Sequence, residues 1–322
     1  MPIWLSETEV RALLPLPELL DAVEQALAAF SARAASQPIR TVLSIPGGVL
    51  ACMPGLLKEQ GALGAKLVTV CPNNLERGLT SHLATILLLD PDTGQLLAIM
   101  DGRYITEMRT AAASAVAVRY LARKNSQRLA IIGSGVQAAS HLQALSLVRN
   151  FREVRCWSRT PQNLHKFVDQ WKHGPYAVTA TDNAQQAIET ADVIALVAAG
   201  SDPVIQDAWV KPGACIVAVG ACRPSEKELQ PSLLARARLF VDSREGAFRE
   251  SGDILDAVSR GHITENHILG EVGELVADPR LGRLDENDIT IFKSLGMAVE
   301  DLAAAQLVYQ RARHAGRGVE LP

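Results

Sequence analysis

The sequence has few of the features that mark secreted or metal-binding proteins. Its five cysteines are odd in number, form no Cys-x-x-Cys pair, and four of them lie in apolar, strand-like contexts. We therefore expect buried thiols in a reducing compartment and no disulfides. His262 and His267 are five residues apart, with no cysteine or carboxylate at metal-ligand spacing, so no metal site is predicted.

Excess charge and long hydrophobic runs are also missing. The formal net charge is -3 and charged residues make up 21% of the chain, which gives no electrostatic reason to expect a nucleic-acid partner. No apolar run reaches membrane-spanning length, and the opening MPIWLSETEV lacks a basic segment followed by an apolar one. These absences predict a cytoplasmic protein without a membrane or nucleic-acid partner.

What is present indicates two domains, because 322 residues exceed what one compact core usually takes. Ser6 and Glu9 have the spacing of a capping box at the start of a short helix, and residues 17–35 carry apolar side chains at helical spacing. Short strand-like runs follow at 40–45, 49–53, 62–70, 83–89 and 96–100, the last two joined by a turn at 90–94. They predict a largely antiparallel sheet.

The second half of the chain has another pattern. An alanine-rich helix is predicted at 105–121, followed by six short apolar segments at 128–132, 154–157, 177–180, 193–197, 214–219 and 239–241. Helical or turn-like sequence separates them, which predicts an α/β fold with a doubly wound parallel sheet of Rossmann type. We expect this sheet to be complete by about residue 242.

A last helix, predicted at 294–315, should return to the first domain. The expected domains are therefore a mixed α+β domain for substrate binding and dimerisation, residues 1–115 and 294–322, and an NAD(P)-binding domain, residues 116–293.

A glycine-rich turn lies between the first predicted strand of the second domain and the helix after it. The sequence there is Gly133-Ser134-Gly135-Val136-Gln137-Ala138, which has the G-x-G-x-x-A spacing in its required context. The first glycine permits a tight turn, the second lets a pyrophosphate approach the backbone, and the alanine permits close packing of the helix on the sheet. The turn predicts a bound dinucleotide.

The end of the next predicted strand indicates which dinucleotide. An NAD-preferring site normally has an acidic residue there to bind the ribose 2'-hydroxyl, but this chain has Ser158, Arg159 and Thr160. Hydrogen-bond donors and a positive charge suit a 2'-phosphate, so NADPH is the predicted cofactor, with NADH left open. The alternative is that Arg159 is an ordinary exposed loop arginine.

Three cations of the first domain lie in otherwise apolar sequence: Arg40, Lys66 and Arg109. Burying such a group without a partner is costly, and each alone could instead extend its charged end to solvent. No acidic partner is apparent beside them in the sequence. Three together favour binding of an anionic substrate carboxylate.

Eight stretches between residues 37 and 305 resemble the ornithine cyclodeaminase and mu-crystallin family, especially the ketimine reductases within it. They are QPIRTVL, GAKLVTV, SHLATILLLDPDTGQLLAIMDG, ITEMRTAAASA, IIGSGVQAASH, WVKPGACIVAVGACRP, ESGDIL and FKSLGMAVEDLAAA. The resemblance implies a homodimer formed through the first domain, a Rossmann domain for NAD(P), and a small amino or imino acid bound in the cleft between the domains.

The resemblance also implies roles for single residues. Arg40, Lys66 and Arg109 would hold the substrate carboxylate, and Lys66 is the candidate catalytic residue, as proton donor or water organiser. A larger set would bind the cofactor: Ser81, His82, Arg109, Gly133, Ser134, Gly135, Val136, Gln137, Ser158, Arg159, Thr160, Ala198, Val219 and Ser294. Without the resemblance, His82 at the head of a strand would be interpreted as structural.

Two positions bear on the reaction. Members of the family that cyclise ornithine resemble one another in carrying an aspartate and a glutamate where this chain has Cys222 and Ala51. Neither residue can replace a carboxylate base at neutral pH. The predicted activity is therefore NADPH-dependent reduction of cyclic ketimines, 1-pyrroline-2-carboxylate to L-proline and 1-piperideine-2-carboxylate to L-pipecolate. The alternatives are ornithine cyclodeaminase, alanine dehydrogenase, or a non-catalytic, crystallin-like protein that binds NADPH or a small ligand.

Overall fold

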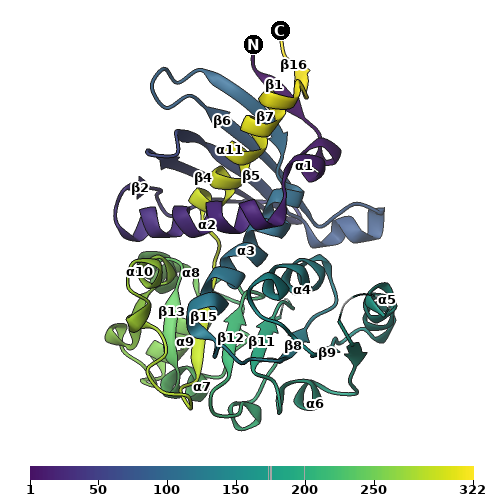
Figure 1. Cartoon of the computed structure of the whole chain (residues 1–322), viewed down its shortest axis with the longest axis vertical. Coiled ribbons are helices and arrows are strands. Elements are labelled where there is room, and N and C mark those ends of the chain that lie inside the picture. Colours follow the sequence, from purple (N-terminus) through teal and green to yellow (C-terminus); the bar gives the residue numbers. More distant parts are fainter. Residues whose placement is uncertain (173, 175, 199) are drawn as a thin grey trace. The chain divides into compact units, whose positions relative to one another are not determined.

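The computed structural model describes residues 1–172, 174, 176–198 and 200–322, which fold into two compact units. Unit 1 consists of Met1–Ala113 and Gly296–Pro322, and unit 2 of Ser114–Leu295. The first boundary falls within helix α3 (Arg103–Leu121), and both units contain a sheet covered by helices (Figure 1).

The sheet of unit 1 is largely antiparallel, as the strand-like runs predict. Its strand order is β16-β1-β7-β6-β5-β4-β2, with β3 paired to β4, and only the β1–β7 pair is parallel among the strand pairs of the described residues. The strands are β1 (Ile3–Leu5), β2 (Ala35–Ser36), β3 (Thr41–Ile45), β4 (Gly48–Leu57), β5 (Ala62–Val70), β6 (His82–Leu89), β7 (Leu96–Asp101) and β16 (Val319–Glu320).

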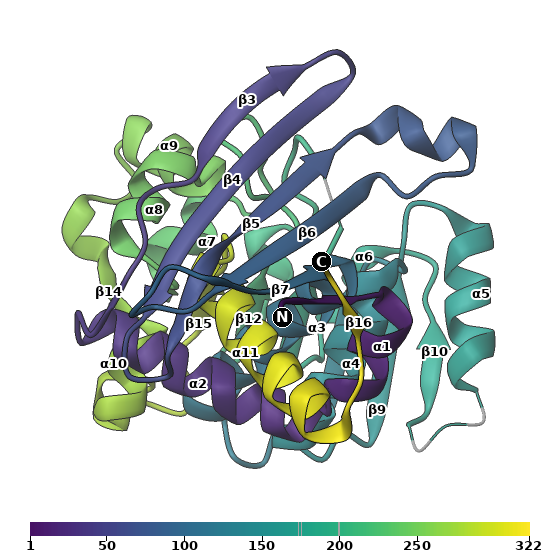
Figure 2. The same cartoon turned by 90° about the horizontal axis from the view of Figure 1, so that it is seen from above.

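The helices of unit 1 are α1 (Glu7–Leu13), α2 (Leu16–Ser31), the first part of α3, α11 (Ala298–Ala315) and the 3-10 helix η1 (Pro72–Arg77). The predicted capping box of Ser6 and Glu9 opens α1. Helix α11 packs on α2 and on strands β4, β5 and β6 (Figure 2). The predicted start of this last helix at residue 294 is wrong, because Gly296 has a φ of +78° and the extended Met297 is the N-cap.

Unit 2 has the predicted doubly wound arrangement, and neighbouring strands of its sheet are parallel throughout. The strand order is β10-β9-β8-β11-β12-β15-β13-β14. The strands are β8 (Arg128–Ile132), β9 (Glu153–Trp157), β10 (Val178–Ala180), β11 (Val193–Leu196), β12 (Cys215–Ala218), β13 (Arg238–Val241), β14 (Ile268–Glu271) and β15 (Thr290–Lys293).

The helices of unit 2 connect these strands. They are the second part of α3, α4 (Val136–Val148), α5 (Pro161–Trp171), α6 (Ala184–Ile188), α7 (Pro231–Arg236), α8 (Arg244–Glu250), α9 (Gly252–Ser259) and α10 (Val272–Ala277). Three 3-10 helices complete the unit: η2 (Asp207–Trp209), η3 (Glu265–His267) and η4 (Pro279–Leu281). In the described part of the chain, no helix is both long enough and apolar enough to cross a membrane.

The prediction that the second sheet is complete by residue 242 is wrong. Strand β14 follows at one edge, and β15 inserts between β12 and β13. All four residues of β15 are buried, as expected for a parallel strand covered on both faces. The chain runs from β8 outward to β9 and β10 on one side and to β11 and β12 on the other, so the strand order reverses between β8 and β11. Ligands of such sheets bind at the carboxyl ends of the strands at this point.

Candidate active site

The glycine turn after β8 lies where the strand order reverses. Gly133 has a φ of +131°, and a Cβ there would lie 3.0 Å from the backbone oxygen of Val197, just after β11. Its N–H donates to the backbone oxygen of Trp157 at 2.8 Å, which ties the turn to the end of β9. Any residue with a side chain would be strained here, so the glycine is required by the local backbone.

The second glycine opens the N-terminus of α4 to a ligand. Gly135 is the N-cap of this helix and is exposed, and no atom of the described residues lies within 4 Å of the place where its Cβ would be. Ala138 is fully buried, which lets the helix lie close to the sheet. The first-turn N–H groups of a helix carry a partial positive charge and bind phosphate. Ser134 lies between the two glycines, and Val136 and Gln137 are the first residues of α4.

The end of β9 lies beside this turn, since Trp157 is in register with Ile132 at the end of β8. Ser158 is half-buried, whereas Arg159 and Thr160 are exposed, and Thr160 is the N-cap of α5. Residues 158–160 include no carboxylate. This is the place at which a Rossmann sheet contacts the adenosine ribose.

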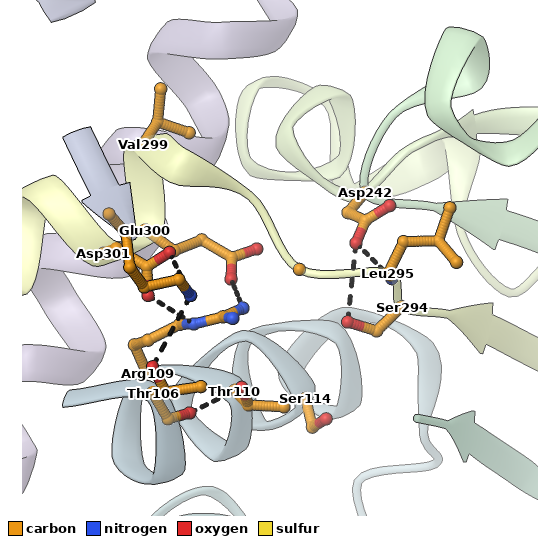
Figure 3. Close-up of polar contacts among 12 residues, drawn as sticks. Thr106, Arg109, Thr110, Ser114, Asp242, Ser294, Leu295, Val299, Glu300 and Asp301 are labelled. Atoms are coloured by element: carbon orange, nitrogen blue, oxygen red, sulfur yellow. Dashed lines mark hydrogen bonds and ion pairs between the residues drawn. The ribbon is translucent and has the colours of Figure 1, made fainter. Parts of the chain in front are cut away.

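Three further residues predicted to bind the cofactor follow the ends of strands β11, β12 and β15. Ala198 and Val219 follow the carboxyl ends of β11 and β12. Ser294 is buried, and its hydroxyl donates to Asp242 at 3.4 Å, while the N–H of Leu295 donates to the same carboxylate at 2.6 Å (Figure 3).

Ser81 and His82 belong to unit 1, at the start of β6, where the Ser81 hydroxyl is hydrogen-bonded to Nδ1 of His82 at 3.0 Å. The cofactor contacts of these residues stay predictions.

The three predicted substrate-binding cations, Arg40, Lys66 and Arg109, are called here the cationic group. Lys66 is 2% exposed on β5, and its cross-strand neighbours Met53 and Ile86 are buried and apolar. Its Nζ lies 2.6 Å from Oδ2 of Asp301 and 3.5 Å from the Thr106 hydroxyl. A buried lysine among apolar residues is therefore held by one carboxylate.

The same carboxylate also binds Arg109 (Figure 3). Nε of Arg109 donates to Oδ1 of Asp301 at 2.9 Å, and Nη1 donates to Oε2 of Glu300 at 2.5 Å. Glu300 and Asp301 are fully buried in the first turn of α11, where a helix N-terminus favours negative charge. No acidic partner is apparent beside Lys66 and Arg109 in the sequence, because their partners come from a helix far along the chain.

Arg40 joins the group through Gly296. Its Nη2 donates to the backbone oxygen of Gly296 at 2.9 Å, and a Cβ on Gly296 would collide with the guanidinium of Arg109. Gly296 thus contacts both arginines, and it must be a glycine because of its positive φ and this close approach.

Burial and the neighbouring charges both affect the pKa of Lys66. Burial lowers the pKa of Lys66 to about 8, with Asp301 opposing the shift and Arg109 and Arg40 adding to it. The group and its two carboxylates thus bring three cationic and two acidic side chains together.

A second buried ion cluster lies in unit 2 and was not predicted. Lys293, at the end of β15, lies 2.7 Å from Glu228 and 3.0 Å from Asp253, and all three are buried. Glu228 also accepts the N–H of Gly220 at 2.9 Å, so the cluster anchors the loop after β12. Burial raises the pKa of Glu228 to about 7. Burial alone would lower the pKa of Lys293, but Glu228 and Asp253 raise it above its ordinary value.

The signal that could have predicted these clusters is an ionisable residue within an otherwise apolar run. Glu300 and Asp301 lie in AVEDLAAA, and Lys293 ends the strand TIFK. The positions that bear on cyclisation are Ala51, buried on β4, and Cys222, exposed after β12. Within the described residues, no cluster of histidine, cysteine and acidic side chains could hold a metal ion.

Comparison with known proteins identifies the family of the chain. Residues 2–316 match the family model of the ornithine cyclodeaminase/mu-crystallin family. The chain is 42% identical over 314 residues to the ketimine reductase mu-crystallin of Rattus norvegicus, covering 96% of each. It is 37% identical to Thermococcus litoralis Delta(1)-pyrroline-2-carboxylate reductase, solved with NADH and L-proline, with a TM-score of 0.96 over 99% of this chain and 100% of that one.

An archaeal alanine dehydrogenase, solved as a dimer with bound NAD, is 34% identical and has a TM-score of 0.95 over 100% of this chain and 99% of that one. Identity and coverage of this extent show a common family. The chain belongs to the ornithine cyclodeaminase/mu-crystallin family.

Proposed function

We propose that this protein reduces cyclic imino acids, 1-pyrroline-2-carboxylate to L-proline and 1-piperideine-2-carboxylate to L-pipecolate, with NADPH as its preferred cofactor. The chain is an NAD(P)H-dependent oxidoreductase that acts on C=N bonds, as its similarity to the ketimine and pyrroline-2-carboxylate reductases indicates. The substrates and the cofactor preference are the proposal.

The observation that carries the proposal is the grouping of Arg40, Lys66 and Arg109 within unit 1, around Asp301 and Gly296. Three cationic side chains from different elements meet here, which suits an anionic substrate. Arginine binds carboxylates with two parallel hydrogen bonds, so Arg40 and Arg109 are suited to this task.

In the proposed reaction, the Gly133 turn and the N-terminus of α4 would hold the cofactor, which would supply a hydride. Arg40 and Arg109 hold the substrate carboxylate and so orient the ring next to it. That hydride would go to the imine carbon, and the ring nitrogen gains a proton either before binding or from the Lys66 ammonium. The C=N bond becomes a C–N single bond, and the product is the cyclic amino acid.

The residues of this chain disfavour two alternatives, ornithine cyclisation and a purely structural role. Cyclisation of ornithine needs a base near the iminium carbon, and positions 51 and 222 hold alanine and cysteine. Glu300 and Asp301 are bound by Arg109 and Lys66, which opposes their use as free bases. A purely structural protein would not need the phosphate turn. The dimeric state of the archaeal alanine dehydrogenase supports a homodimer here as well.

The test of the activity is a substrate panel with the purified protein. Each imine, pyruvate with ammonia, and ornithine are incubated with NADPH or NADH, and loss of the reduced-nicotinamide absorbance is followed. Oxidation with the cyclic imines, giving proline or pipecolate, supports the proposal. Oxidation only with pyruvate and ammonia would identify an alanine dehydrogenase, ornithine consumption without net cofactor turnover a cyclodeaminase, and ligand binding without turnover a carrier.

Arg159→Ala tests the cofactor preference. A charge-assisted hydrogen bond to a 2'-phosphate contributes about 1.5–3 kcal/mol, so the KM for NADPH should rise roughly tenfold or more while that for NADH changes little. The measurement is steady-state kinetics with both cofactors. Arg152→Ala is the matched control, because Arg152 is also exposed and lies before β9 rather than after it. Equal effects of Arg159→Ala on both cofactors would contradict the 2'-phosphate assignment. The two solved relatives described above contain NADH or NAD, so the kinetics with NADH test the alternative to an NADPH preference.

A further inference from the structure

The carboxylate of Asp301 binds Lys66 and Arg109 at once, which the proposed reaction does not by itself require. One oxygen of its carboxylate lies 2.6 Å from Nζ of Lys66, and the other accepts from Nε of Arg109 at 2.9 Å. The two cations come from strand β5 and helix α3, and Asp301 comes from α11. A single rigid carboxylate therefore connects an ammonium and a guanidinium from two other elements.

We propose that Asp301 is a positioning residue that fixes the distance between Lys66, as proton donor, and Arg109, as binder of the substrate carboxylate. This inference rests on the proposed function, because it assigns both cations to one substrate. Asp301 acts through these two side chains, and it need not touch the substrate.

The burial of the three residues supports this role. Asp301 is fully buried, Lys66 is 2% exposed and Arg109 is 5% exposed. Lysine and arginine side chains lose rotamer freedom when they are fixed, and a bridging carboxylate keeps them fixed in the absence of substrate. A preorganised pair of groups contributes to rate because no reorientation is then needed in the transition state.

Few charged groups face Lys66, so a change in its pKa can be assigned to one of them. Strands β4 and β6 face it with the apolar side chains of Met53 and Ile86. The charged and polar groups that face it come from α11, from α3 and from the segment before β3: Asp301, Arg109, Thr106 and Arg40. Glu300 contacts Arg109. Asp301 is thus the carboxylate that forms an ion pair with Lys66, and it favours the ammonium form.

Asp301→Asn tests the inference, because it keeps the size of the side chain and removes its charge. With the ammonium as proton donor, kcat for imine reduction should fall at high pH, in wild type near the Lys66 pKa of about 8. Loss of an opposite charge at this distance should move this limb to lower pH by about one to three units. It should also lower kcat at neutral pH.

Two further variants separate charge from position. Glu300→Gln removes a second carboxylate that binds Arg109, whereas the ion pair of Lys66 is with Asp301, so this variant should raise the KM for the imine and leave the pH limb in place. Asp301→Glu keeps the charge and lengthens the side chain by one methylene, so it should retain the limb and lower kcat. Wild-type kcat in Asp301→Glu would overturn the positioning role, even if Asp301→Asn does not fold.

A measurement independent of turnover separates the inference from the proposed function. Protein with 13C-labelled lysine side chains gives an NMR titration of Lys66, assigned by loss of its signal in Lys66→Met. The Lys66 pKa should be lower in Asp301→Asn than in wild type, and close to wild type in Asp301→Glu. An unchanged Lys66 pKa in Asp301→Asn would overturn the inference. Inactivity of the wild type towards both imines would instead remove the proposed function and leave this titration readable.

Discussion

Replacing Lys66 by methionine should lower kcat/KM for the cyclic imines by about a hundredfold to ten-thousandfold, the range that general acid catalysis contributes. Methionine preserves most of the apolar stem of lysine, which packs beside Met53 and Ile86 on the buried face of β5. Asp301 keeps its contact with Arg109 in this variant, so no carboxylate is left without a cation. The loss should therefore fall on catalysis rather than on folding.

The measurement is steady-state kinetics with each imine at saturating cofactor, together with the melting temperature of the variant. A fall confined to kcat assigns Lys66 to proton transfer, whereas a rise confined to KM assigns it to carboxylate binding. Lys58→Met is the matched control, since Lys58 is exposed in the turn between β4 and β5 and should have no effect. Wild-type kinetics in Lys66→Met, with the protein folded, would contradict both roles.

Local sequence patterns predicted most of the elements of the fold. Strands β5 and β8 begin and end where the apolar runs 62–70 and 128–132 do. The Gly133 turn was recognised because its spacing, the strand before it and the helix after it are all local features. Such features depend on neighbouring residues, so one sequence suffices to identify them.

Strand β15 shows where local patterns fail. It has four residues and is buried on both faces, so it lacks the alternation that marks a half-exposed strand. Its place between β12 and β13 depends on pairing with strands far away in the sequence. The polar segment 283–288 before it also gave no sign that the chain re-enters the sheet.

The sequence drew attention to the three cations of the candidate site but not to its two carboxylates, Glu300 and Asp301. Arg40, Lys66 and Arg109 were conspicuous because each interrupts apolar sequence, and the structure groups them. Arg109 and Asp301 are 192 residues apart, and no local spacing relates them. The sequence therefore indicated the cations but not the two carboxylates that bind Lys66 and Arg109.

The stability of unit 2 should be sensitive to loss of the buried cation that Lys293 provides to Glu228 and Asp253. Replacing Lys293 by methionine should lower the free energy of unfolding by about 3–5 kcal/mol near neutral pH, because it leaves two buried carboxylates without their cation. Lys227→Met is the matched control: Lys227 pairs with Asp256 at 3.2 Å, but both side chains are partly exposed. A pair of this kind contributes at most about 1 kcal/mol.

The effect of Lys293→Met should depend on pH in a defined direction. Burial raises the pKa of Glu228 from its ordinary value of 4.5 to about 7, so in wild type its stabilising contribution is full below pH 4.5 and is lost as pH rises through 7. Removing Lys293 removes an attraction that lowers this pKa, so the variant should bind the Glu228 proton even more tightly. The deficit should therefore be smaller at about pH 5 than at about pH 8, because protonation removes one of the two uncompensated charges. Urea denaturation at both pH values measures it, and a deficit that is constant or grows towards low pH would show that Lys293 does not neutralise Glu228.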